Sequence, residues 1–522
     1  MEEENNLVKD LNLIVKSSVF VLIASLTSKI FVYFYRIVVA RYYGPDVFGL
    51  FSLAVMVSSL IIVASSLGLC DGLLRYLSFY QTKKQKQTSI YMFQLSTKIM
   101  LVSSIAAGIL LFIFSSQISI YLFHNPELIT FLRIFSFVVP ITVIGNTFIT
   151  VTRAYEKIGW FSFLSYLSHN IIKVFFILIL IFIGLKNKAI AYSYLFGALG
   201  ALILAFLITK KIDPYLFKKN EIYDKDKKDK AAKEILSYSL PLMFTFFISS
   251  LLFWADSFAI GFFKTVREVG FYNAAVPLAM LIAILPELFM KLYFPLINKE
   301  YSKGKKNMPL IKELSKQIGK WIFIINIPLV IILVLFPENF LLLIFGQDYL
   351  PATNSLRILT ISVFISSVLV GIPYRLISMI GKSRLIMYNS FFIIILNIIL
   401  NFFLVPMKNI LFIDNTNGLI GASLSILITS SFTGVIYILQ TRRYLSFIPL
   451  RKKVLQIFLI ALIAGALTFY MKKILIVNFA SFILLVLFFI CLYSLLILTT
   501  NCLDRNDLAV LSPIKKIFNR KF

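Results

Sequence analysis

The sequence predicts an all-α integral membrane protein of about 14 transmembrane helices, forming two parallel-repeat six-helix lobes around a central cavity plus two C-terminal helices. Composition is the first observation: hydrophobic residues make up 59% of the 522 residues and charged residues only 15%. Soluble domains contain about 45–50% apolar and about 25% charged residues, so a water-facing fold is excluded. The length of the apolar stretches and an internal repeat are the other two observations.

A helix that crosses the hydrocarbon core needs about 20 apolar residues at about 1.5 Å per residue. Fourteen such stretches lie between charged or turn-rich breaks, at about 13–38, 47–74, 90–116, 128–151, 160–184, 189–209, 235–262, 270–297, 318–337, 354–375, 385–406, 418–440, 454–471 and 474–499. Runs such as 393–400 are continuously apolar, whereas the strands of a membrane barrel alternate, so helices are expected.

The Lys and Arg residues predict the orientation of these spans. Of the 52 residues, 39 lie in or beside the termini and the loops after even-numbered spans, and nine lie in or beside the other loops. Because positively charged loops stay in the cytoplasm, both termini of this cell-membrane protein are expected there. Glu2, Glu3 and Glu4 give the N-terminus the wrong charge for a signal peptide, so the first span is expected to remain in the mature protein.

The longest break between spans is a highly charged segment. It mixes Lys with Asp and would lie against an anionic leaflet, which favours a membrane-hugging linker over nucleic-acid binding. The expected division is an N-terminal six-helix lobe at 1–210, a cytoplasmic linker at 211–234, a C-terminal six-helix lobe at 235–441, helices 13 and 14 at 442–500 and a basic cytoplasmic tail at 501–522.

An internal repeat relates the two lobes. Residues 40–55 align without gaps with a segment from about 260, so that Gly49 matches Gly270, and Arg133 matches Arg357 further along. Chance similarity between apolar segments is the alternative. Six helices are an even number, so duplicated units have the same orientation and enclose a cleft that rocking of the two bundles could open to either side.

Polar residues within the spans are the candidate ligands of that cleft, because a charge at the bilayer centre costs about 2.5–3.5 kcal/mol and faces the bundle interior. Helical spacing places several of them on common stripes. The candidates are Lys29, Tyr33 and Arg36 in the first span, Arg133 in the fourth, His169 and Lys173 in the fifth, Asp256 in the seventh, Arg357 in the tenth and Asn397 in the eleventh.

Structural roles are the alternative for each candidate. Lys29 and Lys173 could pair with Asp256 or Glu287, and the Asn and Ser side chains could bridge helices. Arg133 and Arg357 begin only about one turn inside the outer face, so they could reach the headgroups instead.

The sign of the intramembrane charge predicts the ligand class. Basic residues outnumber acidic ones within the spans, which suits an anion such as phosphate or pyrophosphate. Three cysteines and two histidines are too scattered for a disulfide framework or a zinc site, and no cofactor is expected.

Three segments carry a family resemblance: VVARYYGPDVFGLFSLAVMV, the run SLGLCDGLLRYLSFY at 66–80, and LLLIFGQDYLPATNSLRILTIS. The last contains an FG-x-x-Y element at Phe345, Gly346 and Tyr349. Over nearly the whole chain the sequence resembles the polysaccharide or oligosaccharide flippases of the multidrug/oligosaccharidyl-lipid/polysaccharide exporter superfamily.

The resemblance implies a substrate and a mechanism. A polyprenyl phosphate- or pyrophosphate-linked glycan would move from the cytoplasmic to the outer leaflet through a cationic cavity. Lys29, Arg36 and Arg41 match the family's habit of placing basic residues along and after the first helix. The related peptidoglycan-precursor flippases carry arginines deep in that helix, where this chain has Lys29.

Further partners are expected besides the bilayer. Glycan polymerase or transferase machinery is one, and a coupling Na⁺ or H⁺ carried by Asp256 or Glu287 is another. A cation-coupled multidrug antiporter of the same superfamily is the alternative function, although it would need more intramembrane acids. A membrane glycosyltransferase is a third class, but the outer loops hold only scattered acids, and no nucleotide-binding G-x-x-x-x-G-K-[ST] loop occurs.

Overall fold

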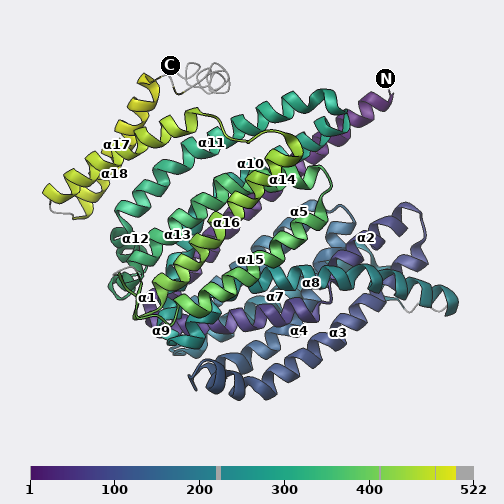
Figure 1. Cartoon of the computed structure of the whole chain (residues 1–522). Coiled ribbons are helices and arrows are strands. Elements are labelled where there is room, and N and C mark those ends of the chain that lie inside the picture. Colours follow the sequence, from purple (N-terminus) through teal and green to yellow (C-terminus); the bar gives the residue numbers. More distant parts are fainter. Residues whose placement is uncertain (1, 219–224, 411–412, 476–477, 501, 503–522) are drawn as a thin grey trace, which may run out of the picture. The chain divides into compact units, whose positions relative to one another are not determined.

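The computed structural model describes residues 2–218, 225–410, 413–475, 478–500 and 502 (Figure 1). The chain forms two compact units: Met1–Asn273 with Asn401–Ala422 make unit 1, and Ala274–Leu400 with Ser423–Phe522 make unit 2. The expected lobes and linker follow different boundaries and stay predictions, and residues 219–224 of the linker lie outside the described residues.

Almost every described element is a helix. The elements that lie wholly in unit 1 are α1 (Glu2–Ser65), α2 (Leu69–Thr82), α3 (Lys86–Gln117), η1 (Ile118–Leu122), α4 (Leu128–Ala154), α5 (Ile158–Ser162), η2 (Phe163–Ser168), α6 (His169–Phe182), α7 (Lys188–Ile212), η3 (Pro214–Phe217), α8 (Lys225–Phe263), β1 (Asn409–Ile410) and β2 (Ile413–Asp414). The two short strands pair antiparallel. Helices α3, α4 and α7 lie side by side in this unit (Figure 1).

Three helices contribute residues to both units: α9 (Val266–Met280), α15 (Ser383–Leu404) and α16 (Leu419–Leu445). The remaining elements belong to unit 2: η4 (Leu281–Ala283), α10 (Ile284–Ser302), η5 (Lys305–Asn307), α11 (Met308–Leu335), α12 (Pro337–Ile344), η6 (Gln347–Ala352), α13 (Thr353–Ile365), η7 (Ser366–Val370), α14 (Gly371–Met379), α17 (Lys453–Ile474) and α18 (Phe479–Thr499). The last two helices pack on α11, where the Tyr493 hydroxyl donates a 2.9 Å hydrogen bond to the Ile324 carbonyl.

Thirteen helical segments of the described residues are long and apolar enough to cross a membrane. The first, Phe20–Ser65, has 46 residues, which at about 1.5 Å per residue is more than twice the about 30 Å of hydrocarbon. It therefore contains two of the expected spans, which agrees with the predicted count of about 14. The division falls at Gly44, whose φ of 76° and ψ of 177° are not helical, and Pro45 begins the second segment.

The second segment of α1 crosses α9 at two glycines. A Cβ atom added to Gly49 would lie 1.9 Å from the carbonyl oxygen of Val266, and one added to Gly270 would lie 2.1 Å from that of Pro45. Val266 follows Pro45 by the same number of residues as Gly270 follows Gly49. The contact is thus reciprocal between positions that the sequence repeat matches, which supports the repeat.

The FG-x-x-Y element forms a turn between α12 and α13 that is anchored by two buried rings. Gly346 has a φ of 105°, a conformation that favours glycine, while Phe345 and Tyr349 are buried with ring centroids 5.6 Å apart. The most specific motif of the resemblance is therefore a packing element.

The glycine crossing predicts a large effect of one methyl group. Gly49→Ala is expected to lower the free energy of unfolding by about 1–3 kcal/mol or more, because backbone cannot yield as a flexible side chain can. Gly159→Ala is the matched control, since its Cβ would have nothing within 4 Å and alanine favours the helix. Thermal unfolding in detergent measures both, and equal midpoints for the two variants would contradict the crossing.

Candidate functional site

A cationic cavity of about 230 Å³ lies within unit 1. Helices α1, α6, α7, α8 and α9 line it, and its polar side chains are those of Tyr35, Arg36, Ser52, His169, Asn170, Lys173, Tyr194 and Asn273. Among the residues that the structure describes, no Asp or Glu lines the cavity. The cavity therefore presents basic groups and neutral hydrogen-bonding groups together.

Lys173 is held in this cavity by neutral groups. Its side chain is 6% exposed, and its Nζ donates a 3.0 Å hydrogen bond to Oδ1 of Asn170. The ammonium also lies 4.6 Å from the ring centroid of Tyr35 and 5.3 Å from that of Tyr194, within the range of cation–π attraction. Its charge is thus attracted by aromatic faces and an amide oxygen.

Arg36 is the second cation of the cavity. In the part of the chain that the structure describes, neither Arg36 nor Lys173 forms an ion pair with a carboxylate. Two cations that line one cavity without a counter-charge are costly in a low-dielectric setting. An anionic ligand would remove that cost.

The turn η2, which joins α5 to α6, orients these groups. The π-helical turn η2 directly precedes His169 and rotates the following residues relative to a regular α-helix. Asn170 then donates 3.0 Å to Oγ of Ser28, which ties α6 to α1. Tyr35 is fixed in turn, since its hydroxyl lies 3.1 Å from the Ile190 carbonyl on α7.

His169 supplies an unpaired polar atom. Its buried Nε2 has no hydrogen-bond partner among the described residues, and its ring lies edge-on to Tyr194 with centroids 4.8 Å apart. Buried polar atoms are nearly always hydrogen-bonded, so this nitrogen remains available to a group that enters the cavity.

The glycine crossing also shapes the cavity wall. Ser52 stands three residues after Gly49, and Asn273 stands three residues after Gly270; both line the cavity. They are matched by the same repeat that matches the two glycines. The close approach of α1 and α9 therefore brings equivalent positions of the two repeats to one wall.

The structure brings three of the predicted site residues together: Arg36, His169 and Lys173. Lys29 and Tyr33 are half-buried on α1 but do not line this cavity. The face of α1 that does so carries Val32, Tyr35 and Arg36, so the predicted stripe meets it only at Arg36. Asn170 and Tyr35 were not predicted from the sequence as site residues, although each adjoins a predicted residue.

Asp256 and Asn397 lie elsewhere. Asp256 on α8 is 3% exposed and accepts a 2.8 Å hydrogen bond from the Asn401 amide of α15. Asn397, one turn earlier on α15, is buried in unit 2. The Asp256 carboxylate is thus buried against an amide donor and lies outside the cationic cavity.

Arg133, on α4, is exposed and contacts two side chains of α3. Its Nε is 3.4 Å from Oγ of Ser115, and its guanidinium lies 5.5 Å from the ring centroid of Phe112. This arrangement resembles the headgroup-directed alternative more than a cavity ligand.

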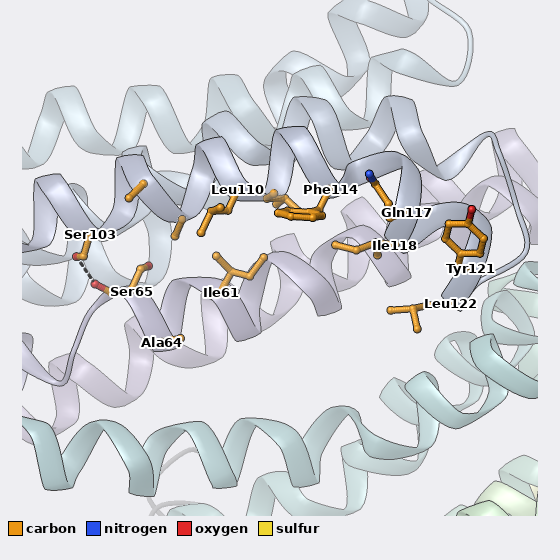
Figure 2. Close-up of a pocket in the computed structure, with 13 residues that line it drawn as sticks. Ile61, Ala64, Ser65, Ser103, Leu110, Phe114, Gln117, Ile118, Tyr121 and Leu122 are labelled. Atoms are coloured by element: carbon orange, nitrogen blue, oxygen red, sulfur yellow. Dashed lines mark hydrogen bonds between the residues drawn. The ribbon is translucent and has the colours of Figure 1, made fainter.

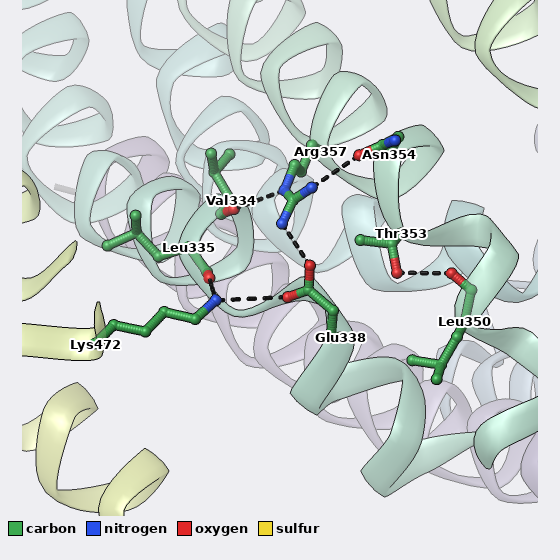
Figure 3. Close-up of polar contacts among 8 residues, drawn as sticks. All are labelled: Val334, Leu335, Glu338, Leu350, Thr353, Asn354, Arg357 and Lys472. Carbon is green, nitrogen blue, oxygen red and sulfur yellow. Dashed lines mark hydrogen bonds and ion pairs between the residues drawn. The ribbon is translucent and has the colours of Figure 1, made fainter. Parts of the chain in front are cut away.

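Arg357 belongs to an ionic network in unit 2 (Figure 3). It donates 2.5 Å to Glu338 and 2.7 Å to Asn354, and Glu338 also lies 3.6 Å from the ammonium of Lys472. Lys472 donates 2.6 Å to the Leu335 carbonyl. The network joins α17 to α12 and α13 and gives Arg357 a structural partner.

An apolar groove of about 770 Å³ runs between α1 and α3 in unit 1 (Figure 2). Ile61, Leu110 and Phe114 are among its walls, and a hydrogen bond from Ser103 to the Ser65 carbonyl, 2.6 Å long, lies at one end. No charged side chain of the described residues lines it, so it suits hydrocarbon.

Three comparisons with known proteins agree with this architecture. Residues 14–301, more than half of the chain, match the family described as polysaccharide biosynthesis protein. A protein named "Putative O-antigen transporter" from Shigella flexneri is 22% identical over 356 residues, which cover 66% of this chain and 80% of the relative.

Two solved structures share the fold. The lipid II flippase MurJ in an inward closed conformation is 17% identical with a TM-score of 0.68, and the match covers 91% of this chain and 97% of that one. An inward-facing multidrug resistance transporter of the MATE family and MOP superfamily is 15% identical with a TM-score of 0.63, covering 81% and 98%.

The fold and the thirteen apolar helical segments define a multi-pass membrane protein with the architecture of this transporter superfamily. The chain belongs to the polysaccharide biosynthesis protein family. The resemblance to the polysaccharide flippases of the superfamily is thereby confirmed.

The ionic network around Arg357 predicts a modest structural role. In a double-mutant cycle of Arg357→Ala and Glu338→Ala, the coupling free energy of unfolding is expected to be about 0.2–1 kcal/mol and to fall with added salt, because both groups are partly exposed. Denaturation in detergent at two salt concentrations measures it. Lost transport in Arg357→Ala with unchanged stability would instead assign this residue to substrate binding.

Proposed function

We propose that the protein is a flippase that moves a polyprenyl-(pyro)phosphate-linked oligosaccharide from the cytoplasmic to the outer leaflet for surface polysaccharide or glycan assembly. The observation that carries the proposal is that Arg36 and Lys173 line one cavity, and no carboxylate is among its described lining residues. Membership of the polysaccharide biosynthesis family supports it independently.

The chemistry of the cavity suits a phosphate or pyrophosphate. A guanidinium can donate two parallel hydrogen bonds to phosphate oxygens, and an ammonium adds a compact charge. The amide hydrogens of Asn170 and Asn273 are already donated within the protein, so Arg36 and Lys173 would be the groups that hold the phosphate. A cation-coupled multidrug antiporter is the second candidate, but a cationic drug would meet only like charge in this cavity.

Translocation would use rocking-bundle alternating access between two like-oriented six-helix lobes, with both termini in the cytoplasm. The glycan and phosphate would cross inside the protein while the polyprenyl chain stays in hydrocarbon. Glycan polymerase or transferase machinery would use the product at the outer leaflet. The excess of Lys and Arg at the termini and in the loops after even-numbered spans supports this orientation.

Asp256 is the proposed carrier of a coupling Na⁺ or H⁺. Asp256 is 3% exposed and accepts a hydrogen bond from the Asn401 amide, and a buried carboxylate within a membrane-spanning helix is the kind of group that carries ions or protons in transporters. Glu287 was the other candidate, but it forms a 3.1 Å ion pair with Lys291 and is half exposed.

The test of the function is depletion of the protein in its host followed by rescue with variants. Depletion is expected to cause one polyprenyl-linked glycan to accumulate where enzymes added outside the cell cannot reach it. Mass spectrometry of the extracted lipids measures this accumulation. Lys173→Met is expected to slow translocation by about 10-fold to 100-fold, which corresponds to the free energy of one hydrogen bond to a charged group. Lys173→Arg is expected to restore part of the rate.

Lys98→Met is the matched control, because Lys98 is an exposed lysine on α3 away from the cavity. An unchanged lipid pool together with altered drug tolerance would favour the antiporter. Full rescue by Lys173→Met would remove the cavity from the mechanism.

Asp256 predicts a change in ion dependence. Asp256→Asn is expected to abolish the acceleration of translocation by a Na⁺ or proton gradient in vesicles, because a neutral amide neither takes up a proton nor supplies the negative charge that balances Na⁺. Glu287→Gln is the comparison variant, and it should keep the acceleration. Equal gradient dependence of Asp256→Asn and wild type would contradict the assignment.

A further inference from the structure

A second polar cavity, of about 460 Å³, lies within unit 2 and has no part in the site described above. Helices α10, α13, α14 and α16 and the π-helical turn η7 line it. Its volume falls within the about 300–1,000 Å³ of small-molecule sites. Its polar character comes from serine hydroxyls, one tyrosine and three charged groups.

Three hydroxyl groups of this cavity are uncommitted. The side chains of Ser366, Tyr374 and Ser430 make no hydrogen bond to another described residue. By contrast, Ser362 and Ser367 each donate 2.8 Å to a carbonyl four residues earlier. A hydroxyl both donates and accepts, so the three uncommitted groups can meet either polarity in a ligand.

The charges of the cavity are nearly balanced. Lys291 is neutralised by Glu287 at 3.1 Å, which leaves Arg375 as the one cation without an ion pair among the described lining residues. The Arg375 guanidinium lies 5.1 Å from the ring centroid of Phe294 and 5.5 Å from that of Tyr374. Stacking of this kind positions the guanidinium while its edge can still donate hydrogen bonds.

A π-helical turn shapes the wall. η7 separates α13 from α14 and places Ser366, Ser367 and Val370 on the cavity, followed by Gly371, where an added Cβ would meet nothing within 4 Å. Single π-helical turns are rare within α-helices and are frequent at functional sites. The turn thus widens the space beside the uncommitted hydroxyls.

We propose that this cavity binds sugar residues of the transported glycan, an inference that rests on the proposed flippase function. Hydroxyls that donate and accept, one tyrosine ring and a single unpaired guanidinium complement a polyhydroxylated ring with apolar faces. Among the described lining residues, a phosphate would find one cation without an ion pair here, whereas the unit 1 cavity offers two cations and no acid. The lining of the unit 2 cavity therefore suits the sugar part of the substrate better than its phosphate.

The test compares two probes on purified full-length protein in nanodiscs. One is the polyprenyl-pyrophosphoryl glycan extracted from the cells that make the protein, and the other is the same lipid stripped of its glycan. In the double variant Ser366→Ala with Ser430→Ala, affinity for the glycosylated lipid is expected to fall about tenfold, while affinity for the bare lipid stays at the wild-type value. Ser431→Ala is the matched control, because its hydroxyl already donates to the Leu427 carbonyl and does not line the cavity.

Each outcome decides one proposal. Equal affinity of the wild type for both lipids, or an equal loss of both in the double variant at an unchanged unfolding midpoint, overturns the sugar site. If the double variant unfolds, Tyr374→Phe alone replaces it with the same expectation at a smaller, about threefold, loss. Failure of the wild type to bind either lipid overturns the flippase function itself.

Discussion

The close crossing of α1 and α9 is the constraint on which the wall of the cationic cavity depends. Backbone meets backbone there, at Gly49 and Gly270, because neither position has room for a Cβ atom. Within a bilayer, helices gain no hydrophobic driving force from association, so small residues that allow close backbone contact are what hold them together. One turn beyond the glycines, Ser52 and Asn273 reach the cavity from the two helices.

The cavity stores unfavourable electrostatic free energy. An intramembrane charge costs about 2.5–3.5 kcal/mol or more, and Lys173 and Arg36 share one small space. Tyr35, Tyr194 and Asn170 offset part of that cost for Lys173 with ring faces and an amide oxygen. A carboxylate would have offset it more fully, but it would also have repelled an anion. The neutral surroundings thus stabilise Lys173 without adding a negative charge to the cavity.

Hydropathy predicted most of the fold, because the length of an apolar span is a property of the sequence itself. The orientation inferred from loop charge stays a prediction. The repeat was predicted as well, and Gly49 with Gly270 was its visible signature. The site was predicted only in part. Lys173, Arg36 and His169 stood out as polar residues in apolar surroundings, whereas Tyr35 and Asn170 are ordinary in such helices and gain their role only through contacts. The unit 2 cavity was missed for the same reason: serine is common in membrane helices, and a π-helical turn has no signal in the sequence.

The apolar groove between α1 and α3 makes the surrounding lipid part of the protein's packing. An apolar space does not favour water, so in a bilayer hydrocarbon chains in contact with Ile61, Leu110 and Phe114 are its expected occupants. Those chains contribute dispersion energy as core side chains do. Solubilisation exchanges them for detergent tails of another length and shape. The measured stability of the purified protein is therefore a property of the protein together with the amphiphile that occupies this groove.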